Sequence, residues 1–381
     1  MTLATLQIGM EWFTEFPGGL NRVYAHLLAE FAKQGVASLG LVAGSPDVER
    51  MSGGTVRAFA EPSAPLLTRM RAVRRMALPW LRAHGDDALI VSHFAMNAFP
   101  LLDQVKRHPL VVHFQGPWGE ESRAEGGSAA SVTVKEFVER RVYRHAGAAI
   151  VLSHSFGEIL ARRFRVSPER IHVIPGGVDV ARFAQTPSRE HCRVELGWPS
   201  NRPIVLCVRR LVHRTGLDSL IAAADDVRRR VPEALILIGG TGPLAGVLQR
   251  WITAHDLGRT VRMLGHLPDE LLPLAYRAAD LTVVPSHALE GFGLSAVESL
   301  AAGTPCVVTP VGGLVEIVRP LAPQLISQST HPSDIADVLA SGLLGERRLP
   351  SALDCACYAR AHFDWPVIAT RVRAVYEQAA R

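Results

Sequence analysis

One stretch of the chain contains both a buried strand and the helix that follows it: residues 281–303, LTVVPSHALEGFGLSAVESLAAG. Its first four residues are apolar and mostly β-branched, which is typical of a buried strand. Val297, Leu300 and Ala301 then recur at helical spacing until Gly303 ends the pattern. A strand, a glycine-rich loop and a helix in this order indicate a parallel α/β sheet.

Two carboxylates flank the glycines of this loop, Glu290 before Gly291 and Gly293, and Glu298 after them. A helix that begins after such a loop presents unpaired backbone N–H groups and the positive end of its dipole, so it stabilises an anion such as a phosphate. The carboxylates would then accept hydrogen bonds from hydroxyls, which sugars and riboses carry. The sequence therefore predicts a site for a phosphate-bearing polar ligand.

Both glutamates also have a structural interpretation. Ser295 and Glu298 have the spacing of a capping box, in which the glutamate accepts from the backbone of the N-cap residue. Glu290 alone has the alternative of a solvated loop acid. A helix start needs only one cap, so the two glycines and the second acid favour the ligand interpretation.

Length and composition bound the class of protein. At 381 residues the chain is too long for one ordinary core and suits two domains. Its 20% of charged residues and net charge of +5 are those of an ordinary globular protein, and no basic run typical of nucleic-acid binding stands out. No apolar run approaches the ~20 residues that cross a bilayer, and no signal pattern opens the chain, so we expect a cytoplasmic protein with reduced cysteines.

Short apolar runs alternate with helical patterns along the whole chain. In the second half we expect strands at Ile204–Val208, Ala234–Ile238, Val261–Leu264, Leu281–Val284 and Cys306–Val308. In the first half we expect them near Leu39–Ala43, Leu89–Ser92, Leu110–Phe114 and Ala148–Leu152. This alternation predicts an α/β fold of two doubly wound, Rossmann-like domains.

The connection between the halves is expected near residue 180. There the sequence VIPGGVD, residues 173–179, is followed by the polar stretch 185–190. We therefore assign residues 1–180 to an N-terminal domain and residues 181–362 to a C-terminal domain. A C-terminal helix at about 363–381 is expected to pack back on the first domain.

Two further loops follow strands, where open parallel sheets bind ligands. Gly18 and Gly19 precede a helical pattern and permit close approach of a ligand to the backbone, although a simple turn is the alternative. Arg209, Arg210 and Arg214 follow the first strand of the second half. Arginine suits a diphosphate because its N–H groups contact phosphate in pairs, although surface arginines are the alternative, most of all for Arg214.

Taken in order, these motifs resemble those of the family 4 retaining glycosyltransferases, which have the GT-B architecture of two Rossmann-like domains facing each other across a cleft. The resemblance covers nearly the whole chain. It is carried by Gly18-Gly19, by Val173–Asp179 with Phe183 ("VIPNGVD…F"), by Arg210-Leu211 ("GRL…KG"), by Gly240-Thr241-Gly242-Pro243 ("GDGP"), by Glu290–Glu298 (the two-glutamate signature) and by Val311–Glu316 ("GG..E").

The resemblance implies transfer of a sugar from a UDP- or GDP-linked donor to an acceptor hydroxyl, with retained configuration and with no metal or cofactor. Glu290 would receive the hydroxyls of the donor sugar, Glu298 would hold the ribose, and Arg210 would neutralise the leaving diphosphate. Backbone amides would line the sugar diphosphate at Phe292, Gly293 and Leu294. The other donor-binding candidates are Gly18, Gly19, Arg209, Arg214, Thr215, Gly240 and Gly242. The chain also lacks an Asp-x-Asp motif and a spaced His/Cys cluster.

The chain departs from the family pattern at three places. Thr215 stands at the position of the lysine that partners Arg210, and Gly176 stands at the position of an interdomain asparagine. Gln115 stands at the position of a histidine in the first domain. His113 lies two residues back on the same face of its strand and is a catalytic candidate, with a core histidine as the alternative.

Acceptor specificity is expected to depend on loops of the first domain. Gln115, Gly116 and Trp118 are the acceptor-side candidates. The acceptor would be a small molecule, a glycan or a lipid-linked molecule, and the sequence leaves its identity open, as it does the donor base and sugar.

Residues 66–82 form an amphipathic pattern. Its apolar face consists of Leu66, Leu67, Met70, Val73, Ala77 and Trp80, and its basic face consists of Arg71, Arg74, Arg75 and Arg82. One interpretation is a surface helix that packs on the first domain. The alternative is contact with an acidic acceptor or with a membrane surface, which would place the protein at the inner face of the membrane.

Two other classes of function stay open. A catalytically impaired sugar-nucleotide-binding protein is suggested by Thr215 and Gln115. Another enzyme of the same fold, a nucleotide-sugar epimerase or a phosphorylase, is the second. A phosphorylase would need a cofactor-bearing lysine, and the chain has only Lys33, Lys106 and Lys135, all in the first half.

Overall fold

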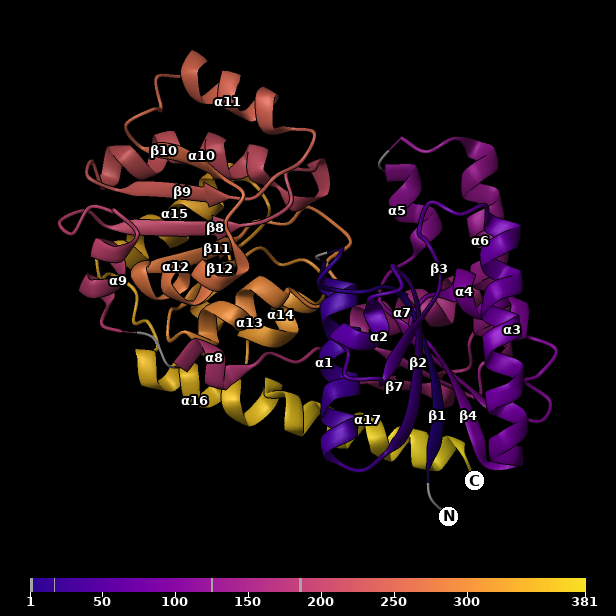
Figure 1. Ribbon diagram of the computed structural model, residues 1–381. Coiled ribbons are helices and arrows are strands. Elements are labelled where there is room, and N and C mark those ends of the chain that lie inside the picture. The colour runs from indigo at the N-terminus through magenta and orange to yellow at the C-terminus, as the bar shows by residue number, and fades with distance from the viewer. Residues whose placement is uncertain (1–2, 17, 125, 185–186) are drawn as a thin grey trace. The chain divides into compact units, whose positions relative to one another are not determined.

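The protein is described by a computed structural model that covers residues 3–16, 18–124, 126–184 and 187–381 (Figure 1). The chain forms two compact units. Unit 1 consists of Met1–Gly176 together with Trp365–Arg381, and unit 2 consists of Gly177–Asp364. The sequence places the boundary near residue 180, and the structure divides the chain between Gly176 and Gly177.

Unit 1 contains a seven-stranded sheet in which every pair of neighbouring strands is parallel. The spatial order is β3-β2-β1-β4-β5-β6-β7. The strands are β1 (Ala4–Glu11), β2 (Ala37–Ala43), β3 (Val56–Ala60), β4 (Ala88–Ser92), β5 (Leu110–Phe114), β6 (Ala148–Val151) and β7 (Ile171–Val173). The order reverses between β1 and β4, which is the switch point of a doubly wound fold.

Helices cover both faces of this sheet. They are α1 (Gly19–Lys33), α2 (Val48–Met51), α3 (Leu66–His84), α4 (Ala95–Ala98), α5 (Trp118–Ala124), α6 (Ala129–His145), α7 (His154–Phe164) and α17 (Trp365–Ala379). Alternate residues of β4 show how the faces are separated: Ile90 packs with α3, α4, α6 and α7, whereas Leu89 and Val91 pack with α1 and α17. The C-terminal helix α17 is therefore part of the unit 1 core, where Tyr376 is fully buried.

Unit 2 contains a five-stranded parallel sheet in the order β10-β9-β8-β11-β12. The strands are β8 (Ile204–Val208), β9 (Leu235–Gly239), β10 (Val261–Gly265), β11 (Leu281–Val284) and β12 (Cys306–Val308). The helices are α8 (Val180–Ala184), α9 (Arg189–Glu195), α10 (Leu217–Arg230), α11 (Ala245–Ala254), α12 (Leu272–Ala278), α13 (Leu294–Ala301), α14 (Gly313–Val318), α15 (Pro332–Leu343) and α16 (Ala352–Phe363). The predicted α/β fold of two doubly wound domains is confirmed.

The sequence missed β1, β3 and β7. Strand β1 is interrupted in the sequence by Gln7 and Gly9, yet it lies in the interior of its sheet, between β2 and β4. Gln7 is fully buried and donates through Nε2 to the Thr5 hydroxyl at 3.1 Å, and a side chain at Gly9 would meet the ring of Tyr24. Strands β3 and β7 are short and lie at the two edges of the sheet, where the apolar pattern is weak.

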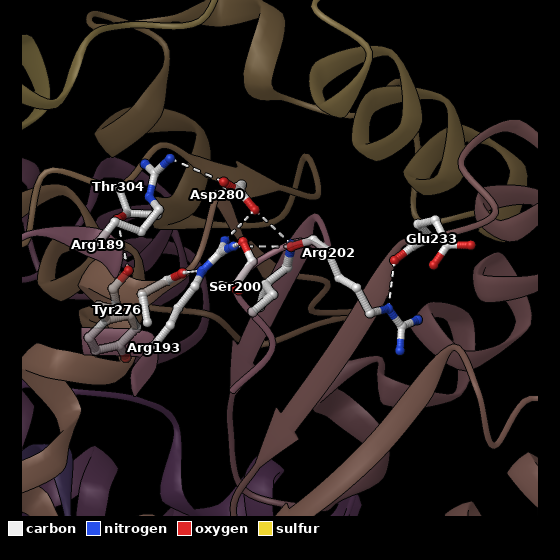
Figure 2. A network of polar contacts seen from close by, with 10 residues as sticks. Arg189, Arg193, Ser200, Arg202, Glu233, Tyr276, Asp280 and Thr304 are labelled. Carbon is white, nitrogen blue, oxygen red and sulfur yellow. Dashed lines mark hydrogen bonds and ion pairs between the residues drawn. The ribbon is translucent and has the colours of Figure 1, made fainter. Parts of the chain in front are cut away.

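A buried arginine joins the segments that surround the amino ends of the unit 2 strands (Figure 2). The guanidinium of Arg193 on α9 donates to three backbone carbonyl oxygens and to Asp280 Oδ2 at 2.7 Å. The same oxygen accepts from the Ile204 amide at 2.7 Å, and Arg189 donates to Asp280 Oδ1 at 3.0 Å. A cavity of about 490 Å³ lies beside this network. The charged residues Arg189, Arg193 and Asp280 that line the cavity bind one another.

We predict that Asp280→Ala lowers the free energy of unfolding by about 3 kcal/mol, because the Arg193 side chain is only 6% exposed and would keep its charge without a counter-ion. Chemical denaturation measures the loss. The matched control is Asp226→Ala, which removes an exposed partner of Arg229 and should cost less than about 1 kcal/mol. Equal losses in the two variants would show that Asp280 does not stabilise the fold through Arg193.

Candidate functional site

The loops that follow β8 and β9 in unit 2 touch through their backbones. A Cβ atom at Gly240 would overlap the carbonyl oxygen of Arg209, and one at Gly242 would lie 2.5 Å from that of Leu211. The Leu211 amide donates to the Thr241 carbonyl at 2.9 Å. The two glycines of the predicted "GDGP" motif thus serve first to let one loop lie directly against the next.

The loop after β11 is held in the same way by the start of α14. The Gly313 amide donates to the Glu290 carbonyl at 2.9 Å, and a Cβ atom at Gly312, where φ is 53°, would overlap that oxygen. Gly293 also has a positive φ, 84°, and is the N-cap of α13. These contacts fix the backbone around Glu290 at the carboxyl end of the sheet.

Arg209 and Glu290 form a buried ion pair in this site. Arg209 Nη2 donates to Glu290 Oε2 and, at 3.0 Å, to the Ser286 hydroxyl, and Nη1 contacts the Ser295 hydroxyl at 3.4 Å. Each side chain of the pair is 11% exposed. Burial raises the pKa of Glu290 and is the largest single influence on it, but the charge of Arg209 and the hydrogen bonds from Arg209 and Ser286 together outweigh burial. The pKa of Glu290 therefore lies below its usual value.

The other predicted residues of the β8 loop lie differently. Arg210 is exposed, and Arg214 donates through Nη1 to the Leu289 carbonyl at 3.2 Å. Thr215 is 3% exposed, and its hydroxyl donates to the carbonyl oxygens of Arg210 and Val212 at 2.9 and 2.6 Å. The structure thus brings Arg209 and Arg214 to the Glu290 loop and uses Thr215 to close a turn.

Glu298 is buried on α13 and accepts a hydrogen bond from Tyr276 Oη at 2.9 Å. The capping-box alternative is wrong, because α13 begins at Leu294, its N-cap is Gly293 and no side chain caps it. A tyrosine that orients a carboxylate is compatible with a ligand role for Glu298.

The glycine loop is buried, and its aromatic side chain points into the core of unit 2. Phe292 is 5% exposed and its ring packs near that of Phe363. Leu294 is half-buried as the first residue of α13.

The sequence missed Ser286 and Tyr276, which contact Glu290 and Glu298. Ser286 follows Pro285 at the end of β11, a position where a polar residue could have been noticed. Tyr276 lies on helix α12, and no motif or strand end in the sequence marks it as a site residue.

His113 in unit 1 has the position of a structural histidine, the alternative that the sequence left open. It is 7% exposed, its Nε2 lies 2.6 Å from Tyr376 Oη, and its ring stacks on His93 with centroids 4.1 Å apart. Burial lowers the pKa of His113 to about 3, so the ring is neutral near pH 7. These contacts anchor α17 to the sheet.

The acceptor-side candidates lie together at the carboxyl end of β5. Nε2 of Gln115 is buried and has no hydrogen-bond partner among the residues that the structure describes. The amides of Trp118 and Gly119 donate to the carboxylate of Glu139 at 2.8 and 3.0 Å. Burial raises the pKa of Glu139 to about 7.

The start of α1 is open. Helix α1 begins at Gly19 with Gly18 as its N-cap, no side chain caps it, and nothing lies within 4 Å of a Cβ atom built at either glycine. Pro17 of this loop lies outside the described residues. In the described part of the chain, no group of three or more His, Cys, Asp or Glu residues is arranged to hold a metal ion.

Two family sequence models match this chain. The model described as "Glycosyl transferases group 1" matches residues 188–362, and the model described as "Glycosyltransferase Family 4" matches residues 17–182. A D-inositol 3-phosphate glycosyltransferase of Corynebacterium efficiens is 30% identical over 389 residues, which cover 95% of this chain and 91% of that protein. The chain belongs to the group 1, family 4 glycosyltransferases.

Some relatives of this glycosyltransferase match over a shorter length, and this chain then spans about 60% of the relative. A D-inositol 3-phosphate glycosyltransferase of Xylanimonas cellulosilytica is 33% identical over 250 residues, which cover 64% of this chain and 60% of that protein. Among solved structures, the fold is similar to that of HepE from Anabaena in complex with UDP, with a TM-score of 0.78 and 20% identity over 98% of this chain and all of HepE. That likeness supports the GT-B class of fold.

Proposed function

We propose that this chain transfers a sugar from a UDP-linked donor to a hydroxyl of a small acceptor, with retention of the anomeric configuration. The observation that carries the proposal is the Glu290 loop, in which an ionised and buried carboxylate lies among glycine-built loops at the carboxyl ends of β8, β11 and β12. The UDP bound in HepE supports the donor class. Relatives named as glycosyltransferases over most of their length favour transfer over epimerisation or binding alone.

Three of the predicted side chains and the start of α13 have the following roles in this proposal. Glu290 accepts hydroxyls of the donor sugar, and the exposed Arg210 stabilises the charge that develops on the leaving diphosphate. The amide groups at the start of α13 add the positive end of a helix dipole. Glu298, oriented by Tyr276, accepts from the ribose hydroxyls.

The acceptor is assigned to unit 1. Relatives of this chain are named D-inositol 3-phosphate glycosyltransferases, so a phosphorylated cyclic polyol is the first acceptor to test. The proposed contacts of the acceptor molecule are Gln115, Gly116 and Trp118. Nε2 of Gln115 has no hydrogen-bond partner among the described residues, so it could donate a hydrogen bond to an oxygen of the acceptor molecule.

We predict that transfer from UDP-glucose to such a polyol continues in excess EDTA, because cationic side chains and helix ends take the place of a metal ion at the leaving group. NMR spectroscopy of the product should show an α-linked sugar. Loss of activity in EDTA that only Mg²⁺ or Mn²⁺ restores would contradict metal independence, and a β-linked product would contradict retention.

Substitution of the two glutamates should affect different steps, catalysis for Glu290 and nucleotide binding for Glu298. Glu290→Gln is expected to lower kcat more than donor affinity, because the sugar ring gains positive charge as its bond to phosphate lengthens. Glu298→Gln is expected to weaken binding of free UDP by roughly 1.5–3 kcal/mol, since ribose bonding does not change during transfer. Calorimetric titration and a turnover assay of both variants measure this split. Unchanged UDP affinity in Glu298→Gln would remove that residue from the site.

Helix α3 carries a second proposal, contact of unit 1 with an anionic membrane surface. The inner side chains Val73 and Ala77 lie in the core, which confirms packing on the domain. The predicted apolar face is wrong at its start, because Leu66 and Leu67 are 42% and 66% exposed. On helix α6, which packs in the same core cluster as α3, Phe137 is 60% exposed. The exposed arginines of the two helices are Arg71, Arg75, Arg82, Arg140, Arg141 and Arg144.

No helix in the described part of the chain is both long and apolar enough to span a bilayer. Any membrane contact is therefore expected to depend on the surface of α3 and α6. We predict that Arg71→Glu with Arg75→Glu weakens sedimentation with phosphatidylglycerol vesicles by at least about tenfold, because each basic residue near such a surface contributes about 1 kcal/mol. The control is Arg250→Glu with Arg262→Glu, two exposed arginines of unit 2. Equal binding by both pairs and wild type would contradict the contact.

A further inference from the structure

Arg209 connects three segments of the unit 2 site. It is the first residue after β8, and its guanidinium contacts Ser286 after β11, Glu290 in the glycine loop and Ser295 in the first turn of α13. The side chain is 11% exposed, so most of its surface is removed from water. A buried cation with three side-chain partners is fixed in place.

Thr215 contributes no charge to this site. It stands where the family pattern has a lysine, and its hydroxyl is directed to two carbonyl oxygens of its own loop. The loop therefore has one positive charge fewer at this position and one more at Arg209.

The hydrogen bonds of Glu290 are unevenly distributed between its two oxygens. Oε2 accepts from both Arg209 and Ser286, the latter at 2.9 Å. Oε1 accepts no hydrogen bond from the residues that the structure describes. One oxygen is thus fixed by the protein, and the other keeps its capacity to accept a hydroxyl.

We propose that Arg209 is a positioning residue for sugar transfer, which holds Oε2 of Glu290 so that Oε1 accepts a hydroxyl of the donor sugar. The inference rests on the proposed function, because it takes Glu290 as the group that receives the sugar. Arg209 acts through Glu290, and Arg210 serves the diphosphate. The two adjacent arginines therefore have separate roles.

The test compares Arg209→Met with wild type in three measurements. The affinity for free UDP should change by less than about threefold, because Arg209 does not contact the nucleotide in this arrangement. The gain in affinity from UDP to UDP-glucose should be lost, and kcat should fall about 10²-fold, the usual effect of losing one electrostatic contact in an active site. The acid limb of the pH profile of kcat should move to higher pH, because burial without Arg209 raises the pKa of Glu290.

Three further variants separate positioning from folding. Arg209→Lys retains a cation and should keep kcat within about tenfold of wild type, with the acid limb unmoved. The double variant Arg209→Met with Thr215→Lys places a positive charge at residue 215 in place of the one lost at residue 209. Its kcat should be at least about tenfold higher than that of Arg209→Met alone. Arg229→Met makes the same chemical change at an exposed ion pair of α10 and should match wild type in every measurement.

Two results would overturn the inference. If Arg209→Met weakens UDP binding as much as it lowers kcat, then Arg209 is a diphosphate ligand. If it lowers only the melting temperature, the ion pair is structural. Failure of the proposed function is distinct from both, because wild type would then bind no UDP-glucose or transfer no sugar from it.

Discussion

The site in unit 2 depends on contact between backbones where no side chain fits. Gly240, Gly242 and Gly312 place one loop against the carbonyl oxygens of another, and a single methyl group at any of them would occupy the same space. Side chains normally keep neighbouring loops apart, so this packing brings the ends of β8, β9, β11 and β12 closer than ordinary loops allow. The positions of Arg209 and Glu290 follow from it, because both belong to the loops that the glycines bring together.

A buried ion pair in such a place needs a physical reason. Removing two charges from water costs several kcal/mol per ion, and their attraction compensates only when the geometry is good and the remaining groups are bonded. Arg209 and Glu290 share Ser286 as a third partner, which meets part of that requirement. Apolar residues of similar size often stabilise a fold as well as a buried ion pair does, so stability alone is weak grounds for this pair, and the proposed role at the donor sugar supplies a reason for it.

The sequence predicted most of the fold because buried parallel strands are continuous apolar runs. All five predicted strands of unit 2 agree with the structure to within one residue at each end, and β8, β11 and β12 agree at both ends. Runs such as IVLCV and LTVV are apolar throughout, as expected of strands that are buried on both faces. The sequence did not predict strand β1, because polar residues interrupt its apolar run. Its polar residues are satisfied by distant partners, with His93 Nε2 2.8 Å from Gln7 Oε1, and no local pattern reveals such a partner.

The sequence leaves the site open where neighbouring residues of the same type have different surroundings. Arg209 and Arg210 are adjacent, and nothing in the sequence tells which of them turns to Glu290, since that depends on the pleat at the end of β8 and on the loop that covers it. His113 was a similar case, because its partner Tyr376 lies 263 residues away on α17. The glycines were identified correctly as a motif, although their packing role is visible only in the structure. A family motif therefore locates a site, whereas the contacts of each side chain decide which residue of the motif carries the charge.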